Sequence, residues 1–162
     1  MIMENSIQAA KAAIYKHDIL QKGSIQITVN GNSMFPFLKN NDRIILNKAG
    51  LDQISIGDIV LTDKGNRLLC HRVFKKNTNS LRTKADALIY SDELAQEKDL
   101  IGKVVVIRSG KKTIRLNTNF AKYSGFLISR VMVIGAFLYI PLRLLRKIGR
   151  TLASFLSYQR QP

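Results

Sequence analysis

The chain has 162 residues, 46% of them hydrophobic, which suits one globular domain with a modest appendage. Its apolar content and three prolines exclude a disordered protein, and the single cysteine, Cys70, excludes disulfides within the chain. The formal net charge of +15 indicates an anionic partner. No histidine or cysteine cluster has zinc-ligand spacing, and no glycine-rich phosphate loop is present, so we expect neither a metal nor a cofactor.

The positive charge is concentrated at the C-terminal end. Residues 1–99 contain 14 Lys and Arg and all 11 Asp and Glu, for a net charge of +3, whereas the remaining residues carry +12. Such an asymmetry indicates that the C-terminal part binds the anionic partner, for which a lipid surface and nucleic acid are the two candidates.

Residues 1–22 are predicted to form a helix, because Ile7, Ile14 and Ile19 recur near helical spacing and Gly23 follows. This segment has no long apolar run and no small-residue cleavage site. We therefore expect neither a secretory signal nor a membrane-spanning helix there.

The middle of the chain is predicted to be a small antiparallel sheet. Short alternating or apolar runs separated by turn residues predict strands at residues 24–30, 44–46, 58–62, 67–74, 81–84, 102–108 and 113–116. Many short strands with close turns are typical of a mainly β fold, either a small barrel or a coiled sheet. Such a platform suits a protease that binds its substrate as an added strand, but small sheets also bind nucleic acids.

Two short segments carry the residues of a hydrolytic site. Ser33 lies between turn-forming residues and a Met-x-Pro sequence, and His71 follows an apolar run. A serine hydroxyl becomes a useful nucleophile when a base lies within hydrogen-bond reach. Cys70 is the neighbour of His71, but adjacent residues of a strand point to opposite faces, so we expect a core cysteine and not a Cys-His pair.

Six segments in a fixed order extend this interpretation. They are residues 29–36 (VNGNSMFP), 41–46 (NDRIIL), 57–61 (GDIVL), 69–73 (LCHRV), 83–87 (TKADA) and 101–104 (IGKV). Their order resembles the signal peptidase I family of serine endopeptidases, in the Ser-His variant of the endoplasmic reticulum, archaea and some spore-forming bacteria. The SOS-repressor self-cleaving peptidases share that fold, and residues 31–34 resemble them too.

The resemblance implies a role for each matching residue. Ser33 is the nucleophile and His71 the general base, where more familiar bacterial enzymes have lysine. Either Asp92, which the resemblance favours, or Asp86 orients His71 and stabilises the imidazolium form. Both acids have ordinary alternatives, a turn cap for Asp86 and a solvated helix start for Asp92.

The residues around the nucleophile would form the oxyanion hole and substrate groove. The resemblance places Gly31, Asn32, Met34 and Pro36 there, with Phe35 and Phe37 nearby; Met34 and the two phenylalanines could equally be packing residues. Many signal peptidases have a serine at the position of Gly31. The oxyanion would therefore depend on backbone N–H groups near Ser33, aided by Asn32.

Two further departures lie next to Asp86. Ala85 replaces a glycine of the family, which would strain the backbone if that position needs a positive φ. Leu88 replaces an asparagine. Both changes raise the alternative of an inactive relative.

Residues 119–162 form a tail of different character. Residues 125–142 are nearly continuous apolar sequence, interrupted by Arg130 and closed by Pro141, which approaches the length of a spanning helix if Arg130 reaches the membrane surface. Beyond it, four basic residues share one helical face, the pattern of an amphipathic helix on an anionic membrane. They are Arg143, Arg146, Lys147 and Arg150. A buried helix covering the sheet and a solvated or nucleic-acid-binding face are the alternatives.

The sequence thus predicts three parts, an N-terminal helix at 1–22, a peptidase-like β domain at 23–118 and a membrane-associating tail at 119–162. The leading hypothesis is a membrane-associated serine endopeptidase that removes a leader or signal peptide, bound as an extended strand. This enzyme would bind the membrane peripherally or through one C-terminal segment. Both flanks of the apolar segment are basic, so the distribution of positive charge gives no orientation across the membrane. The alternatives are an inactive membrane-binding module and a repressor-type self-cleaving domain. Nucleic acid is not an expected partner, since no aromatic stacking platform accompanies the basic residues.

Overall fold

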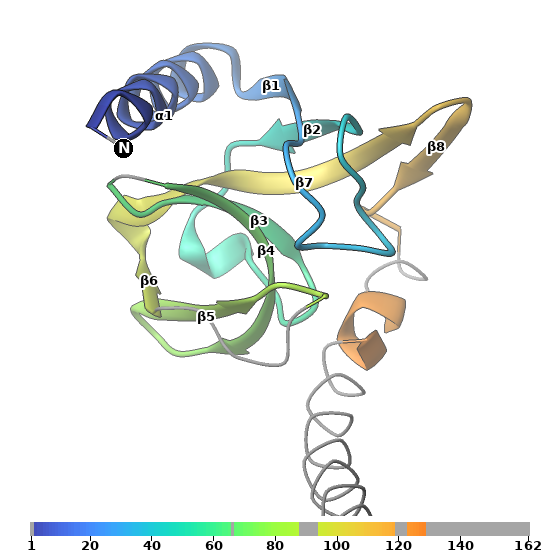
Figure 1. Ribbon diagram of the computed structural model, residues 1–162. Coiled ribbons are helices and arrows are strands. Elements are labelled where there is room, and N and C mark those ends of the chain that lie inside the picture. The colour runs from blue at the N-terminus through green and yellow to red at the C-terminus, as the bar shows by residue number, and fades with distance from the viewer. Residues whose placement is uncertain (1, 66, 88–93, 119–122, 129–162) are drawn as a thin grey trace, which may run out of the picture.

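The computed structural model describes residues 2–65, 67–87, 94–118 and 123–128. Within them a single curled antiparallel sheet carries one long N-terminal helix, so the fold is mainly β, as predicted (Figure 1). The helix lies at one end of the sheet, and a long hairpin projects from the other end.

Helix α1 spans Ile2–Lys22. It ends at Gly23, which has a φ of 72°, and the Gly23 N–H donates to the Ile19 carbonyl at 3.0 Å. A positive φ at the residue after a helix is the usual role of glycine there. Ala12 and Ile19 are buried and anchor the helix to the sheet. No helix in the described part of the chain has both the length and the apolar character needed to cross a membrane.

The strands follow the predicted order, with small differences at their ends. Their bounds are β1 Ser24–Thr28, β2 Arg43–Asn47, β3 Ile59–Asp63, β4 Leu68–Lys76, β5 Ser80–Lys84, β6 Leu94–Gln96, β7 Leu100–Ser109 and β8 Lys112–Arg115. Strand β6 and the 3-10 turns Leu51–Gln53 and Glu97–Asp99 were not predicted, since each is three residues long and too short to show a period.

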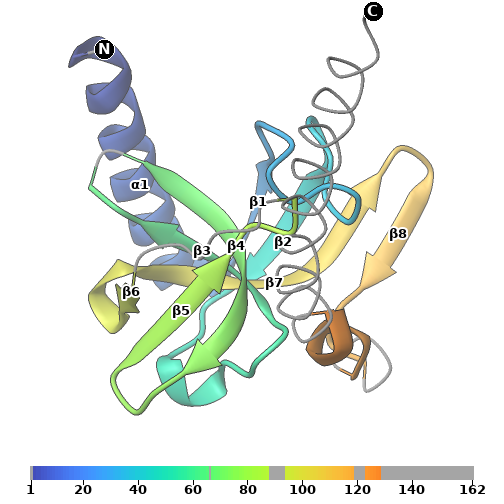
Figure 2. The same cartoon turned by 60° about the horizontal axis from the view of Figure 1, so that its bottom comes forward.

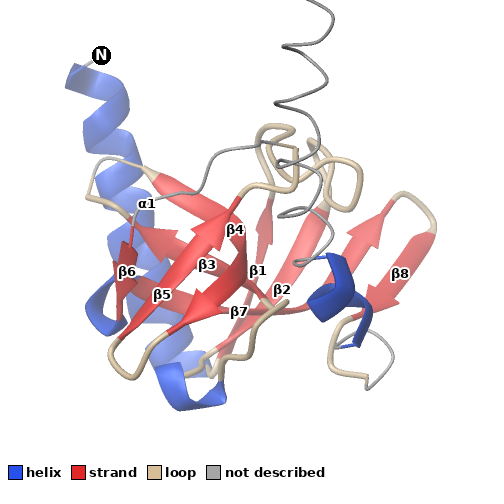
Figure 3. Ribbon diagram, turned by 90° about the horizontal axis from the view of Figure 1, so that it is seen from below, coloured by secondary structure: helices blue, strands red, loops and turns tan. Residues whose placement is uncertain are grey.

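The strand order is β1-β2-β7-β3-β4-β5-β6, and β8 pairs with β7. Irregular register in β2–β7, β3–β7 and β4–β5 accompanies the bending of the sheet. The sheet therefore curls, so that β3, β4, β5 and β6 wrap round to one side of β1 and β2 (Figure 3). The two ends of the strand order do not pair with each other in the described structure.

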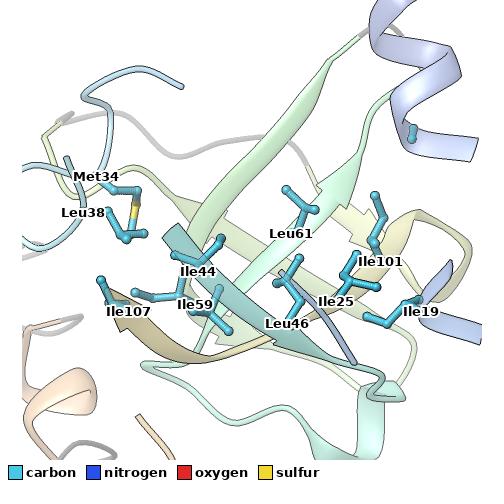
Figure 4. Packing of buried hydrophobic residues seen from close by; sticks show 12 residues of the cluster. Ile19, Ile25, Met34, Leu38, Ile44, Leu46, Ile59, Leu61, Ile101 and Ile107 are labelled. Atoms are coloured by element: carbon cyan, nitrogen blue, oxygen red, sulfur yellow. The ribbon is translucent and has the colours of Figure 1, made fainter. Parts of the chain in front are cut away.

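The core consists of two apolar clusters. The larger contains side chains from α1, β1, β2, β3 and β7 and from the loop after β1, as Figure 4 shows. The smaller, around Val60, Val73 and Leu81, fills the curl of β3, β4 and β5. Because the loop after β1 contributes the buried side chains of Met34 and Leu38, the backbone that directly follows Ser33 is fixed to the core.

Most of the predicted tail lies outside the described residues, including Arg130, Arg143, Arg146, Lys147 and Arg150. Residues 123–128 are described as a short helical segment. A Cβ on Gly57 would collide with the Phe126 nitrogen, and one on Gly125 would lie 2.8 Å from the Gly57 carbonyl oxygen. The start of the tail therefore lies backbone to backbone against the sheet domain.

Two isoleucine substitutions test the assignment of the larger cluster. Ile44 is fully buried in β2, whereas Ile114 in β8 is 47% exposed. We expect Ile44→Ala to lower the free energy of unfolding by about 2–5 kcal/mol, because it leaves a cavity, and Ile114→Ala to lower it by less than about 1 kcal/mol. Chemical denaturation of the full chain measures both, and equal losses would contradict the assignment.

Candidate active site

Ser33 lies in a tight turn that follows β1. The Phe35 N–H donates to the Asn32 carbonyl at 3.1 Å, and the Phe37 and Leu38 N–H groups donate to the Met34 carbonyl at 3.0 Å each. Ser33 is exposed, while the next side chain, Met34, is buried. The turn therefore presents the serine on a backbone fixed from below.

The asparagine pair Asn32 and Asn40 closes the base of this loop. The Asn40 N–H donates to Asn32 Oδ1 at 3.1 Å, and the Gly31 N–H donates to Asn40 Oδ1 at 3.0 Å. Gly31 has a φ of 102°, a conformation that favours glycine over the serine that many signal peptidases have there. The Ser33 and Met34 N–H groups make no hydrogen bond within the described residues, which leaves them available to an oxyanion.

His71 is only 5% exposed and lies in β4 opposite Val60 of β3. His71 and Ser33 both line one groove of about 610 Å³, and their pairing within it stays a prediction. Ser33 makes no side-chain hydrogen bond in the described structure. Hydrogen bonds of catalytic groups are often long before a substrate binds.

The groove lies between two strand edges that have no partner on that side among the described strands. Of these strands, β1 pairs only with β2. Strand β4 pairs with β3 from Leu68 onward but with β5 only from Arg72 onward, so no described strand pairs with the second side of residues 68–71. Both residues 27–34 and residues 67–71 line the groove. An extended peptide in this groove could therefore pair with a backbone edge on either side.

Arg72, the residue after His71, makes a buried ion pair with Asp86. Arg72 Nε donates to Asp86 Oδ1 at 2.9 Å, and Nη2 donates to Oδ2 at 2.7 Å. The Asp86 carboxylate is fully buried. Arg72 Nη1 donates to the Gly57 carbonyl at 2.9 Å, and the guanidinium lies 5.3 Å from the centre of the Phe37 ring.

Asp86 also connects β5 to the serine loop. The Asp86 N–H contacts Met34 Sδ at 3.4 Å, and the Ala87 N–H donates to the Ser33 carbonyl at 2.8 Å. Ala85 is buried, and Asn41 is the one non-glycine residue with positive φ in the described part of the chain. Ala85 therefore carries no such strain. Burial lowers the pKa of the Lys84 ammonium, while the Asp86 carboxylate acts in the opposite direction.

The other predicted site residues are placed in different ways. Gly31, Asn32 and Met34 line the groove, but Pro36, which follows a cis peptide bond, is not among the residues that line it. Both oxygens of Asp86 accept hydrogen bonds from Arg72. Asp92, the acid that the resemblance favours, lies outside the described residues, so its role stays a prediction.

The third wall of the groove was not predicted. Gln8, Lys11 and Tyr15 of helix α1 line it. Their spacing puts them on one helical face, which the sequence does show. However, the sequence gives no indication that this face packs beside β1 and β4.

Cys70 also lines the groove and packs against the larger apolar cluster. Burial, reinforced by the Asp86 carboxylate, raises the pKa of the Cys70 thiol to about 12, although Arg72 opposes this shift. A thiol with that pKa remains protonated near neutral pH and is a poor nucleophile. Cys70 is therefore a packing residue, and Ser33 is the candidate nucleophile of this groove.

A curled antiparallel sheet with a serine and a histidine in one groove fits the class of serine peptidases. The family model described as Peptidase S24-like matches residues 3–105, more than half of the chain. The chain belongs to this family, which indicates a serine peptidase or a self-cleaving domain. The match includes every residue that lines the groove and ends before the tail. No curated protein matches the chain.

The buried ion pair can be tested by removing one partner or both. We expect Arg72→Met to lower the free energy of unfolding by about 3–5 kcal/mol, because the Asp86 carboxylate is left buried without a counter-charge. The double variant Arg72→Met, Asp86→Leu should be less destabilised than the single variant, since no charge remains buried. Chemical denaturation measures both.

Lys22→Met is the matched control, because it removes an exposed pair with Asp18 on helix α1. It should cost less than about 0.5 kcal/mol. If Arg72→Met costs no more than this control, or if the double variant is the least stable protein, the ion pair does not hold the site together.

Proposed function

We propose that this protein is a membrane-associated serine endopeptidase of the signal peptidase type, which removes a leader or signal peptide from a peptide precursor. The observation that supports this function is the groove itself. Ser33 and His71 both line it, between two edges that no other described strand covers, and we propose that an extended peptide is cut there.

The reaction follows from the groups present. Ser33 Oγ attacks the scissile carbonyl carbon while its proton passes to His71, and the N–H groups of Ser33 and Met34 stabilise the oxyanion. The C–N bond then breaks as His71 returns the proton to the leaving amine. A water molecule, deprotonated by His71, hydrolyses the acyl-enzyme and restores Ser33.

We propose Asp92 as the residue that orients His71. Asp86 is the less suitable of the two predicted acids, because its carboxylate is fully buried and each oxygen already accepts a hydrogen bond from Arg72. Moving Asp86 to His71 would leave the buried guanidinium without its counter-charge, at a cost of several kcal/mol.

The membrane is the proposed anionic partner of the tail. In addition to the basic and apolar pattern of the sequence, the described start of the tail has exposed apolar side chains, with Tyr123 65%, Phe126 40% and Leu127 44% exposed. On the serine loop, Phe35 and Phe37 are 52% and 40% exposed. Arg72 lies beside both Phe37 and Gly125, so the serine loop and the start of the tail approach each other at this residue.

A repressor-type self-cleaving domain is the second candidate, because the family match is equally compatible with it. The two functions differ in kinetic order. Self-cleavage within one molecule has a rate constant that is independent of protein concentration, whereas an endopeptidase cuts an added peptide and turns over. An inactive binding module would do neither.

Replacement of the two groove residues tests the enzyme. With a blocked peptide that has small side chains before the scissile bond, we expect Ser33→Ala and His71→Ala each to lower kcat by about 10³-fold or more, since they act as one unit. The kcat of the wild-type protein should fall at acid pH. A plot of log kcat against pH should have a slope of one there, because a single base becomes protonated.

Ser109→Ala, at the end of β7 and away from the groove, is the control and should keep full activity. The proposed site would be wrong if Ser33→Ala cleaves as the wild-type protein does. Cleavage of the chain itself, at a rate unchanged by dilution and without turnover of added peptide, would establish the self-cleaving alternative.

The membrane proposal can be tested with the full chain and lipid vesicles. Each basic residue near an anionic surface contributes about 1 kcal/mol, so changing four of them to Gln should weaken binding to phosphatidylserine-containing vesicles at least about tenfold. The four are Arg143, Arg146, Lys147 and Arg150. Sedimentation with the vesicles measures the affinity.

A matched variant changes the same number of charges on the exposed surface of the sheet domain, at Lys39, Lys48, Lys75 and Lys111. It should bind the vesicles nearly as well as the wild-type protein. Equal weakening in both variants would mean that total charge, and not the tail, governs the association.

A further inference from the structure

We infer that Lys11 and Arg67 form a specificity site for an acidic side chain of the substrate, about four residues from the scissile bond and on the side of helix α1. The inference rests on the proposed endopeptidase function and adds a substrate class to it. It depends on the charge, the pairing and the position of these two residues.

The charges of the groove are unbalanced. Lys11 and Arg67 are its two permanently charged lining residues, and no aspartate or glutamate of the described chain lines it. Neither side chain makes an ion pair or hydrogen bond within the described residues. Lys11 is half-buried against the groove, which reduces the screening of its charge by water. A carboxylate entering the groove would therefore meet two cations that have no other partner.

The acid of the β3–β4 hairpin, Asp63, is already engaged. Asp63 pairs with Leu68, the neighbour of Arg67, across the β3–β4 hairpin. Its Oδ2 accepts from Lys16 Nζ at 2.7 Å, and its Oδ1 accepts from the Gly65 N–H at 2.8 Å. This ion pair also fixes the hairpin end to helix α1, and the two lie side by side in Figure 2. The same contact thus brings the elements that carry Arg67 and Lys11 together and leaves both cations unneutralised.

The position of the pair sets a distance along the substrate. Arg67 lies directly before β4 and precedes His71 by four residues. An extended chain advances about 3.3 Å per residue, so the two are about 13 Å apart along this direction. A peptide lying extended beside β4 covers that distance in about four residues. Between the two ends, the groove is lined by apolar side chains such as Ile27, Val29 and Leu68. The preferred substrate therefore has an acidic side chain separated from the cut by small or apolar residues.

The test uses blocked twelve-residue peptides of Ala, Ser, Val and Leu, each with one Glu that is moved by one position at a time, and a Gln twin of each peptide. Binding to the full-length Ser33→Ala protein is measured by fluorescence anisotropy. We expect the Glu peptide to bind about tenfold or more tightly than its Gln twin, as a charged hydrogen bond in a partly buried site does.

Variants assign this preference to the two residues. Lys11→Gln and Arg67→Gln should each reduce the ratio of Glu to Gln affinity severalfold, and Lys11→Arg should keep it. Lys48→Gln, which removes one exposed lysine outside the groove, is the matched control for net charge. Equal binding of Glu and Gln peptides, or equal loss of preference in the control, would overturn the inference.

The active protein supplies a second readout. Mass spectrometry of the products should show cleavage about four residues from the Glu, always on the same side of it. The cleaved bond should shift along the peptide when the Glu is moved. A cut that ignores the position of the Glu would also contradict the inference. If no peptide is cut while the Ser33→Ala protein still prefers Glu through Lys11 and Arg67, the binding site stands and the proposed enzyme fails.

Discussion

The arrangement of the groove depends on one buried cation. Arg72 follows the candidate base in β4. Its guanidinium contacts Asp86 just after β5, the Gly57 carbonyl before β3 and the ring of Phe37 in the serine loop. A guanidinium presents its donors in a fixed planar fork, so the groups that it satisfies are held at set directions from β4. Arg72 thereby fixes the positions of three segments, distant from one another in sequence, relative to the strand that carries His71.

The consequence reaches Ser33 through the backbone. Asp86 is fixed by Arg72, and the next amide, that of Ala87, holds the Ser33 carbonyl. Net stability is not the main result of such a pair, since desolvation of two charges offsets most of their attraction. What it supplies is relative position, the property that a nucleophile and base need most. Met34 and Leu38 add a second constraint, because they anchor the same loop in the larger apolar cluster.

The sequence predicted the local structure better than the contacts between elements. Alternation in β1 and the turns at Asp63, Asn77 and Ser109 have short-range causes, so every described strand except the short β6 was predicted nearly in place. The pairing of Asp86 with Arg72 was not predicted, because the resemblance offers Asp86 only as a partner of His71. A buried Arg beside a candidate base is itself a sign of a nearby carboxylate. The wall formed by helix α1 could not be predicted, since the polar face of a helix looks the same whether it borders a groove or water.

The resemblance and the physical reading contributed different parts of the candidate site. The motifs shared with signal peptidases predicted Ser33 and His71 as the catalytic residues, and both line one groove in the fold. The warning from Ala85 disappears because that position has no positive φ, whereas Leu88 lies outside the described residues. Composition could not indicate the pairing of Lys16 with Asp63, which leaves Lys11 and Arg67 without a counter-charge, because that depends on how the β3–β4 hairpin meets the helix.

The close approach of Gly57 and Gly125 has a consequence for reach. A protease domain joined to its membrane anchor by a flexible linker samples a wide range of distances from the membrane, so it can reach many peptide bonds of a substrate. Here the first helical segment of the proposed tether packs against the loop whose carbonyl accepts from Arg72, with no room for a side chain between the backbones. If the tail binds lipid, this contact would fix the distance between the groove and the membrane surface. The enzyme would then select the peptide bonds of its substrates that lie at that distance from the membrane.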